Sequence, residues 1–240
     1  MRFANLNLVL VKNLGKWGQQ IFLYSLVAYG ILGCGSTKNY QIQSLSLSEG
    51  ELLAADTLVV SFSVTPRDWA AQGYTVHFLL DRDHLRIKKE GSPVGYGNFT
   101  DGAHVLIALI CDPKSVSLKT PGSVAMRNFY FHQRGQPLVD LQKPLLIVHL
   151  PQKTVYHGNE NLRILFDFLT INAQLGGGYR IHYNLNGKDY FLNRAKPIWC
   201  QEARRIGQHD LTVSLETSDG KLVTGNPFNP MTRSFLAREK

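Results

Sequence analysis

The sequence predicts an all-β chain in which two tandem β-sandwich domains follow an N-terminal signal helix. Three observations lead to this prediction: a repeat with a fixed offset, apolar and polar residues that alternate with period two, and turn residues between the apolar stretches. The 240 residues are enough for a signal segment and two domains of about 100 residues each.

Residues 1–33 have the layout of an export signal. Their basic residues are Arg2, Lys12 and Lys16, they include no acidic residue, and they end in an apolar run over 21–33. Polar side chains interrupt that run, and it is shorter than the roughly 20 apolar residues that span a bilayer. A cleaved signal peptide is therefore favoured over a permanent transmembrane helix.

The apolar run ends at Ile31-Leu32-Gly33-Cys34, which resembles the lipobox of bacterial lipoproteins. The resemblance implies cleavage before Cys34 and attachment of lipid to its thiol, whereas an ordinary signal peptide with an unrelated cysteine is the alternative. If the organism is Gram-negative, Gly35 favours the outer membrane, on its periplasmic or surface side, because an Asp at this place marks inner-membrane retention. Residues 34–43 are expected to form a short polar tether.

An internal repeat divides the rest of the chain. Residues 73–78 (GYTVHF) return as residues 178–183 (GYRIHY), and residues 101–104 (DGAH) return as residues 206–209 (IGQH), in both cases 105 positions later. Two matches in the same order and with the same offset indicate a duplicated domain.

The boundary between the copies is expected near Gly135, Pro137 and Pro144, which interrupt the apolar pattern. We therefore expect one β-sandwich over 44–140 and a second over 144–240.

Each copy is expected to consist of β-strands. Over 162–168 every second residue is apolar, while Arg163 and Asp167 fall on the opposite face, which is typical of a half-buried strand. Asn186-Gly187 separates two apolar stretches and predicts a hairpin, because both residues tolerate a positive φ.

The stretch 207–215 (GQHDLTVSL), followed by Ser218-Asp219-Gly220, resembles the penultimate strand and turn of bacterial immunoglobulin-like and fibronectin-like domains. Residues 101–109 (DGAHVLIAL) are similar to it in the first copy. Tandem repeats of this kind also look like those of uncharacterised bacterial envelope proteins. The resemblance covers only part of each copy, and it implies an immunoglobulin-like fold rather than an activity.

Charge and motifs argue against several classes of function. After Gly33 the chain has 23 basic and 18 acidic residues, a mild surplus that is no nucleic-acid footprint. The sequence lacks a His-Glu-x-x-His motif, a P-loop, a Cys-x-x-Cys pair and a Gly-x-Ser-x-Gly elbow. We expect that the protein is not an enzyme and has no catalytic residue. We also expect that it uses no metal or other cofactor and binds no nucleic acid.

The duplicated histidines are predicted to lie apart within each copy. Alternation places His77 and His182 on outer faces, whereas His104 and His209 share the parity of the core residues. The two histidines of one copy should therefore not coordinate the same metal. His104 and His209 are expected to satisfy a backbone carbonyl at the end of a sandwich, and His77 and His182 remain candidates for an external ligand.

An apolar outer patch on the first copy is the best pointer to a binding surface. On one strand, the first copy has apolar residues where the second copy has Asp210, Thr212 and Ser214. An apolar sheet face is normally covered, either by the second copy or a loop of the same chain, or by a partner envelope protein. The patch comprises Thr75, His77, Leu79, Val105, Ile107 and Leu109.

Two further features concern partners and redox state. A basic stretch in the second copy could bind an anionic envelope polymer, with a solvated face as the alternative. Cys111 and Cys200 would lie in an oxidising compartment and could form a disulfide, although their spacing does not imply it. The basic stretch comprises Lys188, Arg194, Lys196, Arg204 and Arg205.

These features favour a lipid-anchored cell-envelope protein with a non-catalytic binding or scaffolding role. The alternative is a periplasmic metal-binding or hydrolytic protein, whose site would lie at the domain junction and combine histidines and carboxylates from both copies.

Overall fold

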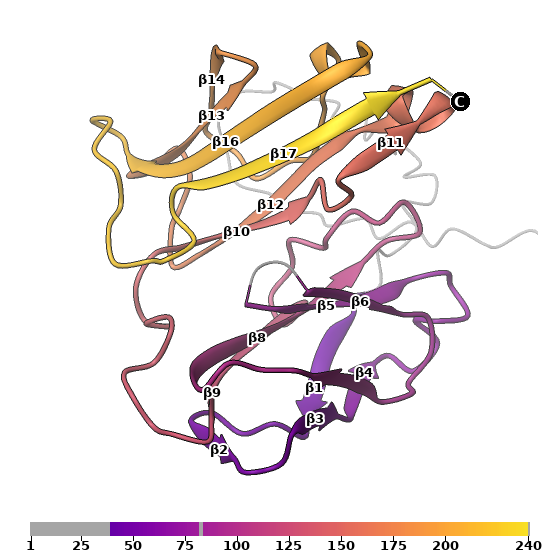
Figure 1. The fold of residues 1–240 in the computed structure, drawn as a ribbon, viewed down its shortest axis with the longest axis vertical. Coiled ribbons are helices and arrows are strands. Elements are labelled where there is room, and N and C mark those ends of the chain that lie inside the picture. Colours follow the sequence, from indigo (N-terminus) through magenta and orange to yellow (C-terminus); the bar gives the residue numbers. More distant parts are fainter. Residues whose placement is uncertain (1–38, 82–83, 240) are drawn as a thin grey trace, which may run out of the picture. The chain divides into compact units, whose positions relative to one another are not determined.

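The computed structural model describes residues 39–81 and 84–239, and nearly all of its regular structure is β-strand. The chain forms two tandem immunoglobulin-like β-sandwiches, which confirms the predicted fold class (Figure 1). Two short 3-10 helices, η1 (Gly158–Arg163) and η2 (Glu202–Arg204), belong to the second sandwich. Within the described residues, no helix has the length and apolar character needed to cross a membrane. The predicted signal peptide, its lipobox and Cys34 lie outside the described residues.

The first sandwich has a five-stranded sheet with the order β2-β9-β8-β5-β6, opposite the strand pairs β1-β4 and β3-β7. Both layers contribute every second residue to one apolar core, for example Val60 and Phe62 on one side and Phe78 and Ala108 on the other. The strands are β1 (Gln41–Leu45), β2 (Glu51–Leu53), β3 (Thr57–Val60), β4 (Phe62–Thr65), β5 (Thr75–Leu80), β6 (His84–Lys88), β7 (Val94–Gly97), β8 (Gly102–Cys111) and β9 (Val124–Phe131).

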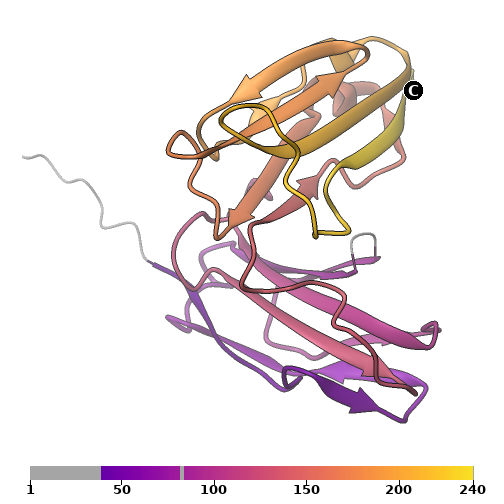
Figure 2. The same ribbon diagram turned by 90° about the vertical axis from the view of Figure 1, so that its left-hand side faces the viewer.

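The second sandwich, coloured orange to yellow in Figure 2, repeats this arrangement. Its five-stranded sheet has the order β11-β17-β16-β13-β14 and faces a sheet with the order β10-β12-β15. In both five-stranded sheets the first strand pair is parallel and the others are antiparallel. The strands are β10 (Leu145–Leu150), β11 (Val155–His157), β12 (Leu165–Ile171), β13 (Tyr179–Leu185), β14 (Lys188–Leu192), β15 (Ile198–Trp199), β16 (Gly207–Thr217) and β17 (Met231–Arg238).

The first sandwich begins earlier than the sequence predicted. Strand β1 starts at Gln41, and Tyr40 is fully buried in the first core, so the end of the predicted tether over 34–43 is part of the sandwich. Tyr40 belongs there because its ring packs on that of Tyr74, with 4.5 Å between the ring centroids.

The repeat extends to individual hydrogen bonds in the β5–β6 and β13–β14 hairpins. Asp81 and Asn186 both have a positive φ, of 53° and 55°, and their side chains accept hydrogen bonds from the backbone of β8 and β16. The predicted Asn186-Gly187 hairpin is therefore confirmed. Asp and Asn suit this place because they tolerate left-handed backbone and offer a short acceptor.

His104 and His209 occupy equivalent places at the ends of the two cores. The Nε2 atom of each lies close to a carbonyl oxygen four residues upstream, 2.8 Å from Thr100 O and 2.7 Å from Arg205 O. Each imidazole also stacks on a phenylalanine, Phe129 or Phe235. The prediction that these histidines satisfy a backbone carbonyl is confirmed.

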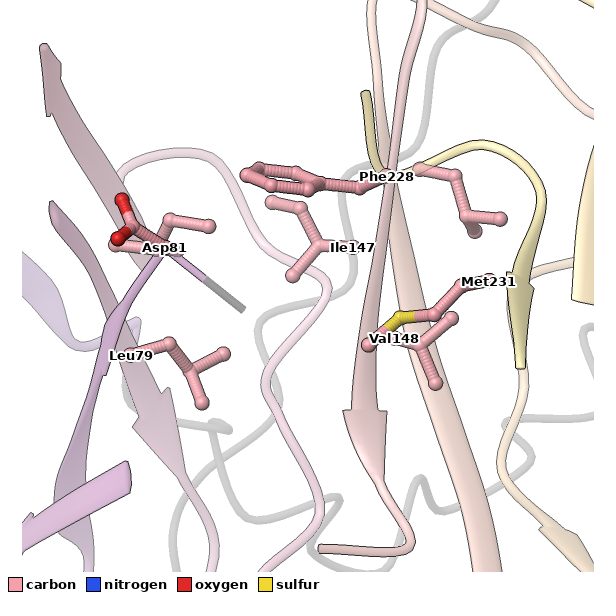
Figure 3. Close-up of a pocket in the computed structure, with 8 residues that line it drawn as sticks. Leu79, Asp81, Ile147, Val148, Phe228 and Met231 are labelled. Atoms are coloured by element: carbon pink, nitrogen blue, oxygen red, sulfur yellow. The ribbon is translucent and has the colours of Figure 1, made fainter. Parts of the chain in front are cut away.

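A third apolar cluster joins the two sandwiches. The outer face of β8 packs against β10, β12 and the loop before β17, and the contact includes Leu145, Ile147, Leu169 and Phe228. Figure 3 shows Leu79 and Asp81 on one side of this contact, with Ile147 and Phe228 on the other. A void of only about 10 Å³ lies among these residues, so the surfaces fit closely.

This contact corrects one expectation. Leu79, Val105, Ile107 and Leu109 are each at most 1% exposed because the second copy covers them, so they offer no surface to an external partner.

Candidate functional site

Polar side chains gather at one end of this apolar contact, and both sandwiches contribute to them. The first sandwich supplies Thr75 and His77 on β5 and Cys111 at the end of β8, while the second supplies His149 on β10 and Asp167 on β12. We call these five residues the junction network. All but Thr75 are at most 1% exposed.

Strand alternation places the two residues from the second sandwich. Leu146 and Val148 point into its core, so His149 points the opposite way, towards the first sandwich. On β12, Phe166 and Phe168 likewise point into the core, and Asp167 lies on the other face.

The network is a continuous chain of hydrogen bonds. The Thr75 hydroxyl lies 3.0 Å from Nε2 of His77, whose Nδ1 lies 2.9 Å from Nε2 of His149. Nδ1 of His149 then lies 2.9 Å from Oδ2 of Asp167. Because the ionised carboxylate can only accept, His149 donates through Nδ1, and the direction of the bond between His149 and His77 depends on their tautomers.

Residues of the loop that follows β8 also bind the Asp167 carboxylate. The backbone N–H and the hydroxyl of Ser117 donate to Oδ2 over 2.9 and 2.6 Å, and the Lys119 ammonium lies 2.7 Å from Oδ1. These charge-assisted bonds satisfy a carboxylate that has no exposed surface, as burial of a charge requires.

Burial and the neighbouring charges set the protonation states. Burial alone would raise the pKa of Asp167, but the His149 hydrogen bond and the Lys119 charge outweigh it and lower this pKa to about 2. Burial, together with the nearby His149, lowers the pKa of His77 to about 3. Burial also raises the pKa of the Cys111 thiol. The network therefore consists of an ionised carboxylate, a neutral His77 imidazole and a protonated thiol.

The order Cys111, His149, Asp167 is that of a nucleophile, a base and an orienting carboxylate. Sγ of Cys111 lies 3.9 Å from Nε2 of His149, however, and that nitrogen already faces His77. The thiol has no exposed surface and a raised pKa, whereas a nucleophilic cysteine needs a thiolate and access to its substrate. The geometry does not support hydrolysis at Cys111.

A groove of about 770 Å³ runs beside the network, with His77 in its wall. Its apolar residues include Ile87 and Trp199, which are 49% and 50% exposed. Three cations, Lys114, Lys153 and Arg204, line it, and none of the described residues in its lining is acidic. We call it the Trp199 groove; its other lining residues are Leu85, Pro113, Ser115, Leu150, Gln152, Tyr156 and Leu165.

The remaining predicted site residues are dispersed. Cys111 and Cys200 are both free and buried, and they belong to different apolar clusters, so the disulfide considered from the sequence is not formed. His182 lies on the outer face of β13, where it pairs with Asp189 and Glu216 at 2.8 Å each. Of the basic stretch, Arg204 lines the Trp199 groove, and Lys188 lies 3.6 Å from Glu202.

His149 was not predicted as a site residue, and Asp167, predicted on the outer face of its strand, lies on that face but is buried. One signal was present: over 145–150, apolar residues occupy both faces of the strand, which is typical of a strand buried on both sides. A histidine on such a strand has to be buried. Its partners, His77 and Asp167, come from distant strands, and no local pattern joins them.

Comparisons with known proteins leave the family open. No family model matches the chain, and no curated protein sequence matches it. Among solved structures, fibronectin(III)-like modules of Clostridium thermocellum CbhA are 16% identical with a TM-score of 0.28, covering 84% of this chain and 95% of that one.

Two other solved structures are similarly distant. The Bacteroides ovatus protein SGBP-B, in complex with a mixed-linkage heptasaccharide, is 9% identical with a TM-score of 0.27, covering 84% of this chain and 71% of that one. A Ca²⁺-stabilised ice-binding adhesin of an Antarctic bacterium is 13% identical with a TM-score of 0.25, covering 85% and 49%. At these TM-scores the similarities carry no argument, and the fold rests on this chain's own strand pairing.

Proposed function

We propose that this chain is an exported, lipid-anchored envelope protein that binds an anionic envelope polymer in the Trp199 groove without catalysis. The groove is the observation on which the proposal depends. It combines a half-exposed indole, an exposed apolar side chain and three cations, and it has a volume suited to a ligand rather than to water alone.

The chemistry of the lining favours a polymer that is both anionic and partly apolar, such as an acidic polysaccharide. An exposed Trp199 ring offers a flat apolar face for sugar rings, and Lys114 and Arg204 can pair with carboxylates or phosphates. Lys153 already pairs with Glu160 over 2.6 Å, so of the three cations it should contribute least to binding an anionic ligand.

The buried contact between the copies supports a scaffolding role for the same groove. Residues of both sandwiches line it, from Ile87 on β6 to Trp199 on β15, so its shape depends on that contact. A closely packed apolar junction keeps such a groove preorganised, which lowers the entropy cost of binding.

Binding to an acidic polysaccharide tests the groove directly. The full chain should bind polygalacturonate in a salt-dependent manner and bind neutral dextran weakly, as measured by affinity electrophoresis or calorimetry. Trp199→Ala and Lys114→Gln should each reduce binding about tenfold. Phe191→Ala is the matched control, because Phe191 is 53% exposed and lies outside the groove. Equal weakening by the control, or no binding by the wild type, would refute the proposal.

The lipobox supports the proposed anchor, and lipid labelling tests it. The wild type should incorporate a fatty-acid analogue, whereas Cys34→Ala should remain an unlabelled precursor. Equal labelling of both forms would refute anchoring through Cys34 and leave the groove proposal to its own test.

A further inference from the structure

We propose that His77, Cys111 and His149 of the junction network bind one copper(I) ion and thereby link the two sandwiches. Their donor atoms all lie within 4.8 Å of one another, and all three residues are buried. Two imidazole nitrogens and a thiolate form a donor set typical of copper and zinc. This site borders the Trp199 groove proposed above and shares only His77 with it.

The distances are close to those that an ion would need. The two facing nitrogens lie 2.9 Å apart, and Sγ lies 3.9 Å from Nε2 of His149. Around a three-coordinate ion with ligand distances of about 2.0–2.3 Å, donors are about 3.5–3.8 Å apart. The nitrogens would have to separate by less than about 1 Å, a small change for two imidazole rings.

In both histidines, the ring nitrogen that would not bind the ion has a hydrogen-bond partner, as is usual for metal-ligating histidines. Nδ1 of His149 donates to Asp167, which fixes the tautomer with a free lone pair on Nε2. Nε2 of His77 faces the Thr75 hydroxyl, which can accept a hydrogen bond as well as donate one. In the His77 tautomer with its proton on Nε2, the Thr75 hydroxyl accepts the hydrogen bond from that N–H, and Nδ1 has a lone pair for the ion.

Charge favours the monovalent ion. On binding, Cu⁺ forms a bond to Sγ of Cys111 while the thiol proton leaves to solvent, so the net charge of the network does not change. Zn²⁺ would add one positive charge to a site whose three ligands are at most 1% exposed, at a cost in desolvation.

The number of ligands points the same way. A structural zinc ion, which would link the two sandwiches as proposed here, almost always has four protein ligands, and among the described residues no fourth His, Cys, Asp or Glu joins this group. Soft thiolate ligands suit both Cu(I) and zinc, so the number of ligands and the charge distinguish the two ions. The Trp199 groove, which has His77 in its wall, provides an entry path for the ion.

Competition with a coloured Cu(I) chelator under anaerobic, reducing conditions tests the proposal. The full chain should remove one equivalent of copper from bathocuproine disulfonate, and X-ray absorption of the complex should show two nitrogen ligands and one sulfur ligand. Copper should also raise the melting temperature, because the ion binds the folded state.

Two cysteine variants locate the site. Cys111→Ser should lower Cu(I) affinity at least about 100-fold, whereas Cys200→Ser, in the core of the second sandwich, should leave it unchanged. Asp167→Asn should lower affinity about 10–100-fold through its effect on His149. The metal-free urea midpoint of each variant shows whether it is folded, and the absorption spectrum of the wild type tests the ligand set without any substitution.

Three results would overturn the inference. They are the absence of copper binding by the folded wild type, retention of copper by Cys111→Ser, and a parallel titration in which Zn²⁺ binds tightly but Cu(I) does not. None of them bears on polymer binding, which is measured on metal-free protein.

Discussion

The outer faces of β8 and β16 occupy equivalent places in two sheets with the same strand order, yet one is buried and the other is partly exposed. On β8 the outward residues are Val105, Ile107 and Leu109, and the second sandwich covers them. On β16 Asp210 is exposed, and Thr212 hydrogen-bonds to Thr232 across the strand pair. The backbone is the same, so side-chain polarity decides which face is covered.

A second comparison extends this conclusion to the polar residues. Cys111 and His77 have Glu216 and His182 as their counterparts 105 positions later. In the second copy these residues belong to a partly exposed cluster in which Arg180 and His182 both pair with the buried Glu216. In the first copy, burial excludes solvent, and the histidine finds a partner in the other sandwich instead.

The largest expected effect tests the covered face. Ile107→Asp places a charge in an apolar contact where Ile107 is 1% exposed, and it should lower the free energy of unfolding by roughly 3–5 kcal/mol. Thr212→Asp, the equivalent change in the second copy, should cost about 0.5 kcal/mol or less. Urea denaturation measures both. If the two variants were equally stable, the contact between the sandwiches would not stabilise the protein.

A smaller effect separates the fully buried Asp167 cluster from the partly exposed Glu216 cluster. Asp167→Asn removes a charge from a side chain with no exposed surface, which also accepts from Ser117 and His149, and it should cost about 2–3 kcal/mol. Glu216→Gln should cost less, about 1 kcal/mol, because the Glu216 side chain is 11% exposed and its partners Arg180 and His182 are 30% and 29% exposed, so water can solvate the pair. Thermal unfolding of the two variants checks the order, and the reverse order would contradict it.

The smallest expected effect is a pH-dependent change in stability that distinguishes His104 from His209, the histidines at the ends of the two cores. The hydrogen bond to Asp81, which is the largest contribution, raises the pKa of His104 above 6.5, whereas His209 faces the uncharged Asn186. A raised pKa means that the stabilisation is fully present below about pH 6.5 and is lost as the pH rises through the folded-state pKa. Asp81→Asn should therefore cost up to about 1 kcal/mol at pH 5.5 and little at pH 9.

The reciprocal change sharpens this comparison. Asn186→Asp gives His209 the carboxylate that His104 already has, so it should add stability at pH 5.5 and little at pH 9. Urea midpoints at the two pH values measure both variants. A loss from Asp81→Asn that is equal at both values would mean that the carboxylate acts only as an uncharged acceptor for the backbone of β8.

Much of the fold could be predicted from the sequence because it depends on local and periodic signals. Alternation identified the core faces of β5, β8 and β16, the Asn186-Gly187 pair identified a hairpin, and the fixed offset identified the duplication. The prediction that His104 and His209 satisfy backbone carbonyls at the ends of the two cores also followed from the alternation of residues along the strands. The start of the first sandwich did not, because Tyr40 is ordered by its contact with the distant Tyr74.

The tertiary structure alone decided what covers the apolar face and which polar groups meet there. The sequence determined that Val105, Ile107 and Leu109 form an apolar outer face, since polarity and parity are properties of one strand. Whether the same chain or a partner covers it depends on how two separate sheets pack. That packing brings together His77, Cys111, His149 and Asp167, whose strands are distant in sequence. Burial then determines the protonation states and the hydrogen-bond partners of these side chains.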